Sequence, residues 1–264
     1  MALFPNNVLH RADQQALCCA FGIRLVTSPA IVQLAKNAGF DSLFIDLEHS
    51  TLTINEASQL CVTALLAGIT PVVRVPHQCG DGFVQRVLDG GAMGVVFPHI
   101  HGPEDARSAA RISKYPPNGT RSMTGQLPQF SLLPTPIPTV IAAGNAAAST
   151  VFLMVETKTA VEPAVLDAIA AVPDVDILLV GANDLSIELG VPGQFESEVF
   201  RDALRAVSRA AGKHGKIMGL AGIYGNREVL EWAVRDLGVG WLLGGQDSGV
   251  LAGGMASVMT GLQL

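Results

Sequence analysis

The stretch FDSLFIDLEHS, residues 40–50, joins an apolar run to a group of charged residues. Residues 43–45 lead directly into Asp46, Glu48 and His49. A strand that is buried on both faces of a parallel sheet reads as a continuous apolar run, and its carboxyl end is where α/β proteins place ligand-facing groups. Two acids beside an imidazole therefore predict a general base with an orienting partner at this end of the strand.

Strand-like apolar runs recur along the chain, and amphipathic helical stretches lie between them. Eight such βα units in 264 residues predict an α/β fold, a (β/α)₈ TIM barrel formed as one domain over residues 1–264. A doubly wound open sheet is the alternative, but no GxGxxG motif follows the first strand. We expect strands at 17–22, 41–47, 70–75, 93–98, 151–156, 175–180, 216–220 and 239–244, and helices at 29–38, 54–67, 82–90, 103–114, 161–171, 198–213, 226–236 and 248–260.

The composition is that of a globular, mildly acidic chain, with 49% hydrophobic residues and a net charge of −6. The Lys and Arg residues form no basic stripe, so nucleic acid is not an expected partner. No apolar stretch of about 18 residues and no basic-then-apolar leader occurs, so we expect no membrane span and a soluble, cytoplasmic protein. The four cysteines lack CxxC spacing, which favours reduced and mostly buried thiols.

Residues 115–149 interrupt the βα rhythm, with six of the fifteen prolines and no clear strand. We interpret this segment as a long βα connection. A connection of this length often serves as a lid or a subunit contact, while an ordered surface excursion with a helix near 137–148 is the simpler interpretation.

Polar residues close several of the expected strands on one rim of the barrel: Arg74, Glu156 and Asp184. Neighbouring strands are about 4.8 Å apart, so Glu156 and Asp184 can reach one cation. Two carboxylates with waters and substrate oxygens suit Mg²⁺ or Mn²⁺ better than zinc. A site rich in histidine, formed by the residues near other strand ends, stays open as an alternative: His77, His99 and His101.

Each of these residues also has a purely structural interpretation. Arg74 can pair with Asp46 or Glu48 and only lock the barrel mouth, Glu156 can begin a helix, and Asp184 can cap one. The functional interpretation places the Arg74 guanidinium beside a developing enolate oxygen. It also gives the turn after the sixth strand, which includes Gly181 and Ala182, free N–H groups that hold a carboxylate.

Several motifs at these positions resemble the HpcH/HpaI aldolase family of metal-dependent class II aldolases. The resemblance covers most of the chain, and its ordered motifs together are specific. It is carried by AGFDSLFIDLEHS (38–50), PVVRVP (71–76), VLDGGAMGVVFPHI (87–100), YPPNGTR (115–121), MVETKTAVE (154–162) and DILLVGANDLSIELG (176–190).

The resemblance implies a barrel that assembles as a hexamer, often with exchange of the last helix between subunits, and that binds pyruvate on a divalent metal. Mg²⁺ is the expected metal, and Mn²⁺ or Co²⁺ also suit. The implied roles are metal ligands for Glu156 and Asp184, the base for His49, enolate stabilisation for Arg74, a partner of His49 for Asp46, support of the histidine's basicity for Asp89, and carboxylate binding by Gly181, Ala182, Asn183 and Asp184.

Two departures from the family pattern affect the expected substrate fit. Family members usually carry Gln where this chain has Met154, and Pro where it has Ala182. Methionine offers no donor comparable to an amide. Both changes alter substrate contacts while leaving the two acidic metal ligands in place.

These observations predict a lyase that cleaves the C3–C4 bond of a 4-hydroxy-2-oxo acid to pyruvate and an aldehyde, with a metal as Lewis acid. One alternative is an oxaloacetate decarboxylase or a macrophomate-synthase-like enzyme that uses the same enolate. A second is a non-catalytic 2-oxo-acid-binding protein. A Schiff-base aldolase needs a pocket lysine, and only Lys158 lies just beyond a strand's active end.

Overall fold

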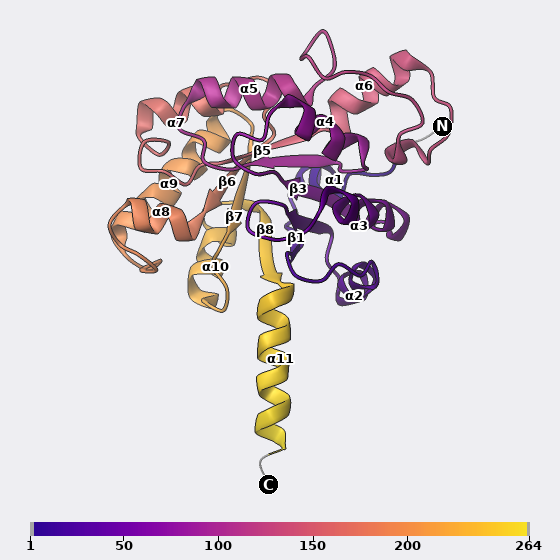
Figure 1. The fold of residues 1–264 in the computed structure, drawn as a ribbon. Coiled ribbons are helices and arrows are strands. Elements are labelled where there is room, and N and C mark those ends of the chain that lie inside the picture. Colours follow the sequence, from indigo (N-terminus) through magenta and orange to yellow (C-terminus); the bar gives the residue numbers. More distant parts are fainter. Residues whose placement is uncertain (1–2, 263–264) are drawn as a thin grey trace.

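The computed structural model describes residues 3–262, and eight parallel strands in it close into a barrel (Figure 1). Each strand pairs with its neighbours in chain order, and the last pairs back with the first. The predicted TIM barrel is confirmed, with every strand within two residues of its expected bounds. The strands are β1 (Cys18–Ile23), β2 (Ser42–Asp46), β3 (Thr70–Arg74), β4 (Gly94–Phe97), β5 (Thr150–Met154), β6 (Ile177–Gly181), β7 (Ile217–Ala221) and β8 (Val239–Gln246).

All the expected helices form, and most of them cover the outside of the barrel (Figure 1). Local sequence signals set several of their ends. Thr53 and Glu56 form a reciprocal capping box at the start of α3, and Pro103 occupies the first turn of α5. The helices are α1 (Asn7–Asp13), α2 (Ala30–Ala38), α3 (Ile54–Ala67), α4 (Asp81–Asp89), α5 (Pro103–Ser113), α6 (Ile137–Ala147), α7 (Pro163–Ala170), α8 (Ala182–Glu188), α9 (Glu198–Lys213), α10 (Arg227–Arg235) and α11 (Asp247–Gly261), with a 3₁₀ turn at Pro128–Phe130.

Successive side chains of each strand point alternately outward and inward, so the buried residues form two layers. One layer packs between the strands and the outer helices, and the other fills the barrel interior, where Phe44 and Phe152 contact Trp241 at ring centroid distances of 6.1 and 5.4 Å. Side chains two or four residues apart on a strand share a face. Asp46 therefore follows Phe44 on the inward face, and Glu156 follows Phe152 in the same way.

Helix α1 closes the amino-terminal end of the barrel, which the sequence did not predict. Its Val8 is 1% exposed and belongs to the interior layer. The Asn6 side chain caps the helix by accepting from the N–H groups of Val8 and Leu9, and it donates to Thr150 Oγ1 at 2.8 Å. A helix of seven residues is too short for hydrophobic periodicity to reveal.

The segment 115–149 is an αβ connection, so the prediction of a βα connection is wrong. Helix α5 already completes the unit that begins at β4, and the segment leads from α5 to the start of β5. Gln129 in this segment donates to the carbonyls of Leu88 and Ala92, which lie just before β4. The segment thus covers the amino-terminal end of the barrel, opposite the strand ends where a lid would act, and it contains α6 where the simpler interpretation placed a helix.

Helix α11 projects away from the barrel (Figure 1). Only its first residue, Asp247, is buried, while Val250, Met255 and Val258 are 60, 65 and 62% exposed. Within residues 3–262, no helix combines the length and the apolar character that a membrane crossing needs.

The four cysteines are free thiols. Cys18 and Cys61 are buried, whereas Cys19 and Cys79 are partly exposed. Burial raises the pKa of the Cys61 thiol, so it stays protonated near neutral pH. The predicted reduced state therefore holds for this structure, although only half of the thiols are fully buried.

Candidate active site

A cavity of about 360 Å³ opens at the carboxyl ends of the strands, where a barrel of this type places its site. Its lining comes from strand ends and loops around the barrel mouth. Every predicted site residue except Asp89 lines it: Asp46, His49, Arg74, Met154, Glu156, Gly181, Ala182, Asn183 and Asp184.

Asp46 and Arg74 form the central ion pair of this cavity. They are register partners on β2 and β3. Arg74 Nε and Nη2 donate to the two Asp46 oxygens at 3.0 and 2.6 Å, and Arg74 Nη1 lies 3.3 Å from Glu48 Oε2. Burial alone would raise the pKa of Asp46, but the hydrogen bonds and positive charge of Arg74 outweigh it and lower that pKa. The ion pair of the structural interpretation is therefore present, and the guanidinium also faces the cavity, where a substrate can meet it.

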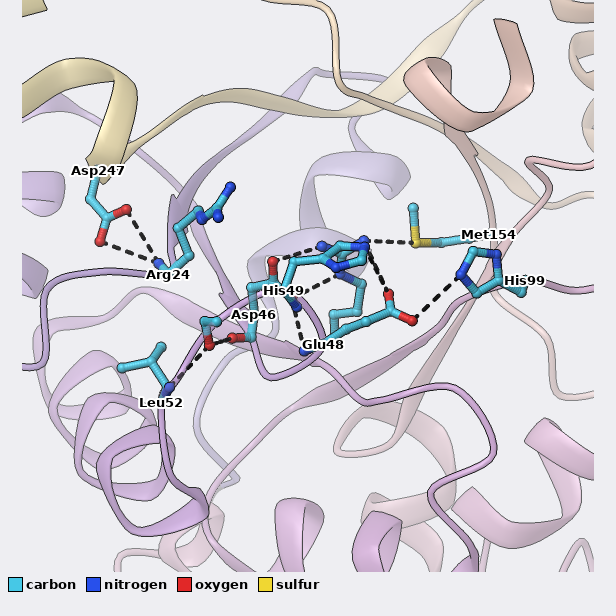
Figure 2. Close-up of polar contacts among 10 residues, drawn as sticks. Arg24, Asp46, Glu48, His49, Leu52, His99, Met154 and Asp247 are labelled. Atoms are coloured by element: carbon cyan, nitrogen blue, oxygen red, sulfur yellow. Dashed lines mark hydrogen bonds and ion pairs between the residues drawn. The ribbon is translucent and has the colours of Figure 1, made fainter. Parts of the chain in front are cut away.

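Asp46, implied as a partner of His49, makes no hydrogen bond to its imidazole ring within residues 3–262. Its Oδ1 instead accepts the main-chain N–H groups of Glu48 and His49 at 3.0 and 3.1 Å. The carboxylate nearest the ring is Glu48, with Oε2 3.9 Å from His49 Nε2. Figure 2 shows this group. Asp46 thus shapes the turn that carries His49, while the half-exposed ring stays available to a ligand.

Glu156 is a buried carboxylate with one unsatisfied oxygen. The residue is 1% exposed, and Oε1 accepts the His99 N–H at 2.8 Å while lying 3.3 Å from His99 Nδ1. Within residues 3–262, Oε2 has no hydrogen-bond partner. Burial, reinforced by the charge of Asp184, raises the pKa of Glu156 to about 7 against the opposing effect of the His99 N–H. A buried oxygen without a partner indicates a place for a cation or a donor group.

Gly181 is required by its closeness to Glu156. A Cβ at position 181 would collide with Glu156 Oε2 and would lie 2.9 Å from the Met154 methyl carbon. Helix α8 begins at Ala182, so Asp184 lies inside its first turn and does not cap it. Residues 181–184 line the cavity, and at Gly181 no side chain separates the main chain from the cavity.

Met154 supplies an apolar wall where the family usually has an amide. It is 3% exposed and ends β5, with its sulfur 4.0 Å from Arg74 Nη1. Figure 2 shows the Met154 side chain, with its sulfur at the end of one of the marked contacts. The chain thus replaces a possible substrate donor with a methyl thioether that packs against the arginine.

Asp89 lies away from the cavity, so one chain does not bring it to His49 as predicted. It ends α4 and precedes β4, which places it at the amino-terminal end of the barrel. There its carboxylate pairs with Arg121 Nη2 at 2.7 Å. The end of α4 leads into the amino-terminal end of β4, whereas site residues of such a barrel lie at the carboxyl ends of the strands. Asp89 and His49 are therefore at opposite ends of the barrel.

The histidine-rich metal site is not found. The rings of His77 and His99 meet edge to face at 5.3 Å between centroids, and His77 and His101 at 6.5 Å, around a neighbouring cavity. Yet residues 3–262 contain no group of three or more His, Cys, Asp or Glu side chains arranged to hold a metal. The predicted pair of acids, Glu156 and Asp184, lines the active-site cavity.

Three polar residues of the cavity were missed by the sequence analysis: Arg24, Tyr224 and Gln246. Arg24 directly follows β1, Tyr224 lies in the loop after β7, and Gln246 ends β8. The signal was present, because each stands at the carboxyl end of an expected strand.

The fold and this cavity define a barrel enzyme with carboxylates, an imidazole and a guanidinium gathered at the strand ends. Residues 25–244 match the family described as HpcH/HpaI aldolase/citrate lyase. The chain therefore belongs to the HpcH/HpaI aldolase/citrate lyase family, and the predicted resemblance is confirmed. The prediction of an aldolase, a carbon–carbon lyase of a metal-dependent class, is confirmed at that level.

Individual relatives match over nearly the whole chain. The 4-hydroxy-4-methyl-2-oxoglutarate aldolase tasA of Hapsidospora irregularis is 54% identical over 96% of this chain and 93% of its own length. The 4-hydroxy-4-methyl-2-oxoglutarate aldolase cghB of Chaetomium globosum is 55% identical over 98% and 94%. The crystal structure of an HpcH/HpaI aldolase from Desulfitobacterium hafniense superposes with a TM-score of 0.90 at 30% identity, covering 100% of this chain and 98% of that one.

Proposed function

We propose that this chain cleaves 4-hydroxy-4-methyl-2-oxoglutarate into two molecules of pyruvate. The observation that carries the proposal is the 54–55% identity, over nearly the full length, to two aldolases named for this substrate. The cavity supports it, because acids, a base and a guanidinium surround a space large enough for a small dicarboxylic acid. The substrate belongs to the predicted class of 4-hydroxy-2-oxo acids.

The reaction requires a base beside the C4 hydroxyl group. When that hydroxyl loses its proton, C4 becomes a ketone carbon, the C3–C4 bond breaks, and its electron pair stays on C3 as the enolate of pyruvate. Proton return to C3 completes the second pyruvate. We assign the base to His49, whose side chain lines the cavity and is 57% exposed. Within residues 3–262 its ring makes no hydrogen bond to the main chain, so it is available to the substrate.

Arg74 is suited to offset negative charge that develops on the enolate oxygen. The residue is 8% exposed, and its guanidinium is fixed by two hydrogen bonds to Asp46. A donor held in place before the reaction costs little reorganisation when charge appears. Asp46 therefore positions two groups of the proposed reaction: it holds the guanidinium of Arg74 and the main-chain N–H of His49.

Glu156 and Asp184 fit a divalent cation. The free oxygen of Glu156 is buried, and the nearby charge of Asp184 raises the pKa of Glu156, as expected for two carboxylates that share a space. We propose these two residues as the ligands and Mg²⁺ as the metal, with Mn²⁺ and Co²⁺ as substitutes. When bound, such a cation supplies Lewis-acid chemistry at the keto oxygen of the substrate. The main chain at Gly181 to Asp184 lines the same wall, and we propose that it holds the C1 carboxylate.

Lys158 gives no support to the Schiff-base alternative. It is exposed and is not among the residues that line the cavity. A lysine that forms a covalent adduct with a 2-oxo acid must reach the keto carbon inside the pocket.

Stoichiometry tests the proposed function directly. Purified protein, stripped with EDTA and then given Mg²⁺, is incubated with 4-hydroxy-4-methyl-2-oxoglutarate, and pyruvate is measured with lactate dehydrogenase. We expect two molecules of pyruvate for each molecule of substrate consumed. Pyruvate release from oxaloacetate without any from the hydroxy acid would reassign the chain as a decarboxylase, and no release from either would favour the binding-protein alternative.

We also propose that the chain forms a homo-oligomer through α11, with a hexamer as the expected size. The helix carries one apolar face, formed by residues 250, 251, 254, 255, 258 and 259, which together line a shallow hollow. Within residues 3–262 this face stays exposed, and exposed apolar surface of this kind marks an interaction site. Exchange of α11 between subunits would bury it.

A further inference from the structure

Arg24 stands at the mouth of the active-site cavity, directly after β1. It lines this cavity together with His49, and the same two residues also line an adjoining hollow outside it. In the barrel order, β1 neighbours β2, which carries the His49 turn, and lies across the barrel from β5, beyond which Glu156 stands. Arg24 is therefore on the base side of the cavity, across from the acids.

The guanidinium of Arg24 faces the cavity without a protein partner among the described residues. Within residues 3–262, no hydrogen bond or ion pair engages its side chain, and only its main-chain N–H has a partner. The other arginine of the cavity, Arg74, is already bound to Asp46 and lies 3.3 Å from Glu48. An arginine with all its donors free suits a carboxylate, which it can hold through two parallel hydrogen bonds.

The main chain of Arg24 is fixed although its side chain is free. The buried Asp247 carboxylate accepts the N–H groups of Arg24, Leu25 and Val26, with the shortest contact 2.8 Å. Figure 2 shows the Arg24 side chain extending away from the Asp247 carboxylate that holds its main chain. The main chain that carries the Arg24 side chain is thus held in place by hydrogen bonds, which lowers the entropy cost of binding an anion.

We propose that Arg24 binds the distal carboxylate of the substrate and selects dicarboxylic acids. This inference rests on the proposed function. In 4-hydroxy-4-methyl-2-oxoglutarate, C4 carries both the hydroxyl that the base must reach and the second carboxylate. A group that holds this carboxylate must therefore lie next to the base and away from the site of the C1 end, and Arg24 meets both requirements by its place beside His49 and opposite Glu156.

Binding of acids that cannot undergo aldol cleavage tests the inference without catalysis. Calorimetry with Mg²⁺ present compares 2-oxoglutarate with 2-oxopentanoate, which has the same carbon chain but lacks the distal carboxylate. We expect the wild type to prefer 2-oxoglutarate, and Arg24→Met to lose on the order of 10- to 100-fold of that preference. Arg24→Lys should keep part of it. Arg227→Met removes a side chain that is 89% exposed on α10 and serves as the control.

Turnover provides the second arm. The substrate 4-hydroxy-4-methyl-2-oxopentanoate has a methyl group in place of the distal carboxylate and would yield pyruvate and acetone. We expect Arg24→Met to lower the ratio of kcat/KM for the dicarboxylate to kcat/KM for this analogue by a similar factor. Equal losses on both substrates, or an unchanged binding preference, would overturn the role of Arg24. A wild type that prefers 2-oxoglutarate through Arg24 but cleaves neither hydroxy acid would instead overturn the proposed function alone.

Discussion

Asp46 and Arg74 stand opposite each other on β2 and β3 and form a buried, two-pronged ion pair, 2.6 Å at its shorter contact. Removing the Asp46 charge leaves the Arg74 guanidinium buried, with only the charges of Glu48, 3.3 Å away, and Glu156 to offset it among those that act on it within residues 3–262. Asp46→Asn should therefore lower the free energy of unfolding by about 3 kcal/mol. Urea denaturation at pH 7 measures it.

The double variant Asp46→Leu, Arg74→Met separates stability from function. Two apolar side chains replace the pair without leaving an unpaired charge, so most of the lost stability should return. Activity should not return, because the guanidinium at the enolate position is gone. A double variant that is as unstable as Asp46→Asn would show that the main-chain contacts of Asp46 dominate its contribution.

Gly181→Ala tests the close approach of β6 to Glu156. The added Cβ would collide with Glu156 Oε2, so either the carboxylate or the strand end must move. We expect a loss of about 1–3 kcal/mol in stability and a weaker Mg²⁺ affinity by calorimetry. Gly212→Ala is the matched control, because nothing lies within 4 Å of a Cβ there and the position is inside α9. Equal behaviour of the two variants would contradict the steric argument.

Stability of the metal-free protein should depend on pH through Glu156. Its folded-state pKa of about 7 exceeds the ordinary value of 4.5, so the folded chain binds more protons than the unfolded chain between these values. The contribution of Glu156 to the free energy of unfolding is thus fully present below about pH 4.5 and is lost as pH rises through 7, by roughly 3 kcal/mol in all. Glu156→Gln should remove this decline in EDTA-treated protein, whereas Glu162→Gln, an exposed control, should retain it.

The site residues that point into the barrel were predictable, because successive side chains of a strand point to opposite faces of the sheet. Phe44 and Asp46 lie two residues apart, as do Val72 and Arg74, so each polar side chain continues a buried interior series into the cavity. Glu156 extends the same series from β5. The fold and most of the cavity therefore follow from apolar runs and the residues that close them.

Contacts that depend on the path of a loop were not predictable in this way. Asp46 has acceptors that suit either the His49 ring or its main-chain N–H, and only the course of the turn decides between them. Asp89 is the last residue of α4, and its pairing with Arg121 depends on a segment with no periodicity. The side on which 115–149 lies was in principle accessible, because a helix expected at 103–114 already completes the fourth unit.

His49→Gln should separate two reactions that share an enolate. Aldol cleavage needs a base at the C4 hydroxyl, so kcat should fall by about 10²- to 10⁴-fold. Decarboxylation of oxaloacetate needs no such base and should be retained. Pyruvate release from both substrates is measured with Mg²⁺ present, and His101→Gln, which lines the neighbouring cavity, is the control. Retention of both reactions by His49→Gln would remove the base assignment.

The apolar face of α11 should hold the subunits together. Met255 and Val258 are 65 and 62% exposed in the single chain, and each would gain about 1.5–3 kcal/mol from full burial in an assembly. Replacing both with Lys places two charges on that face, so light scattering after gel filtration should show a shift from oligomer to smaller species. Ser257→Lys adds a charge at a neighbouring exposed position and should leave the mass unchanged. If the double variant keeps the mass of the wild type, α11 does not form the interface and its exposed face requires another partner.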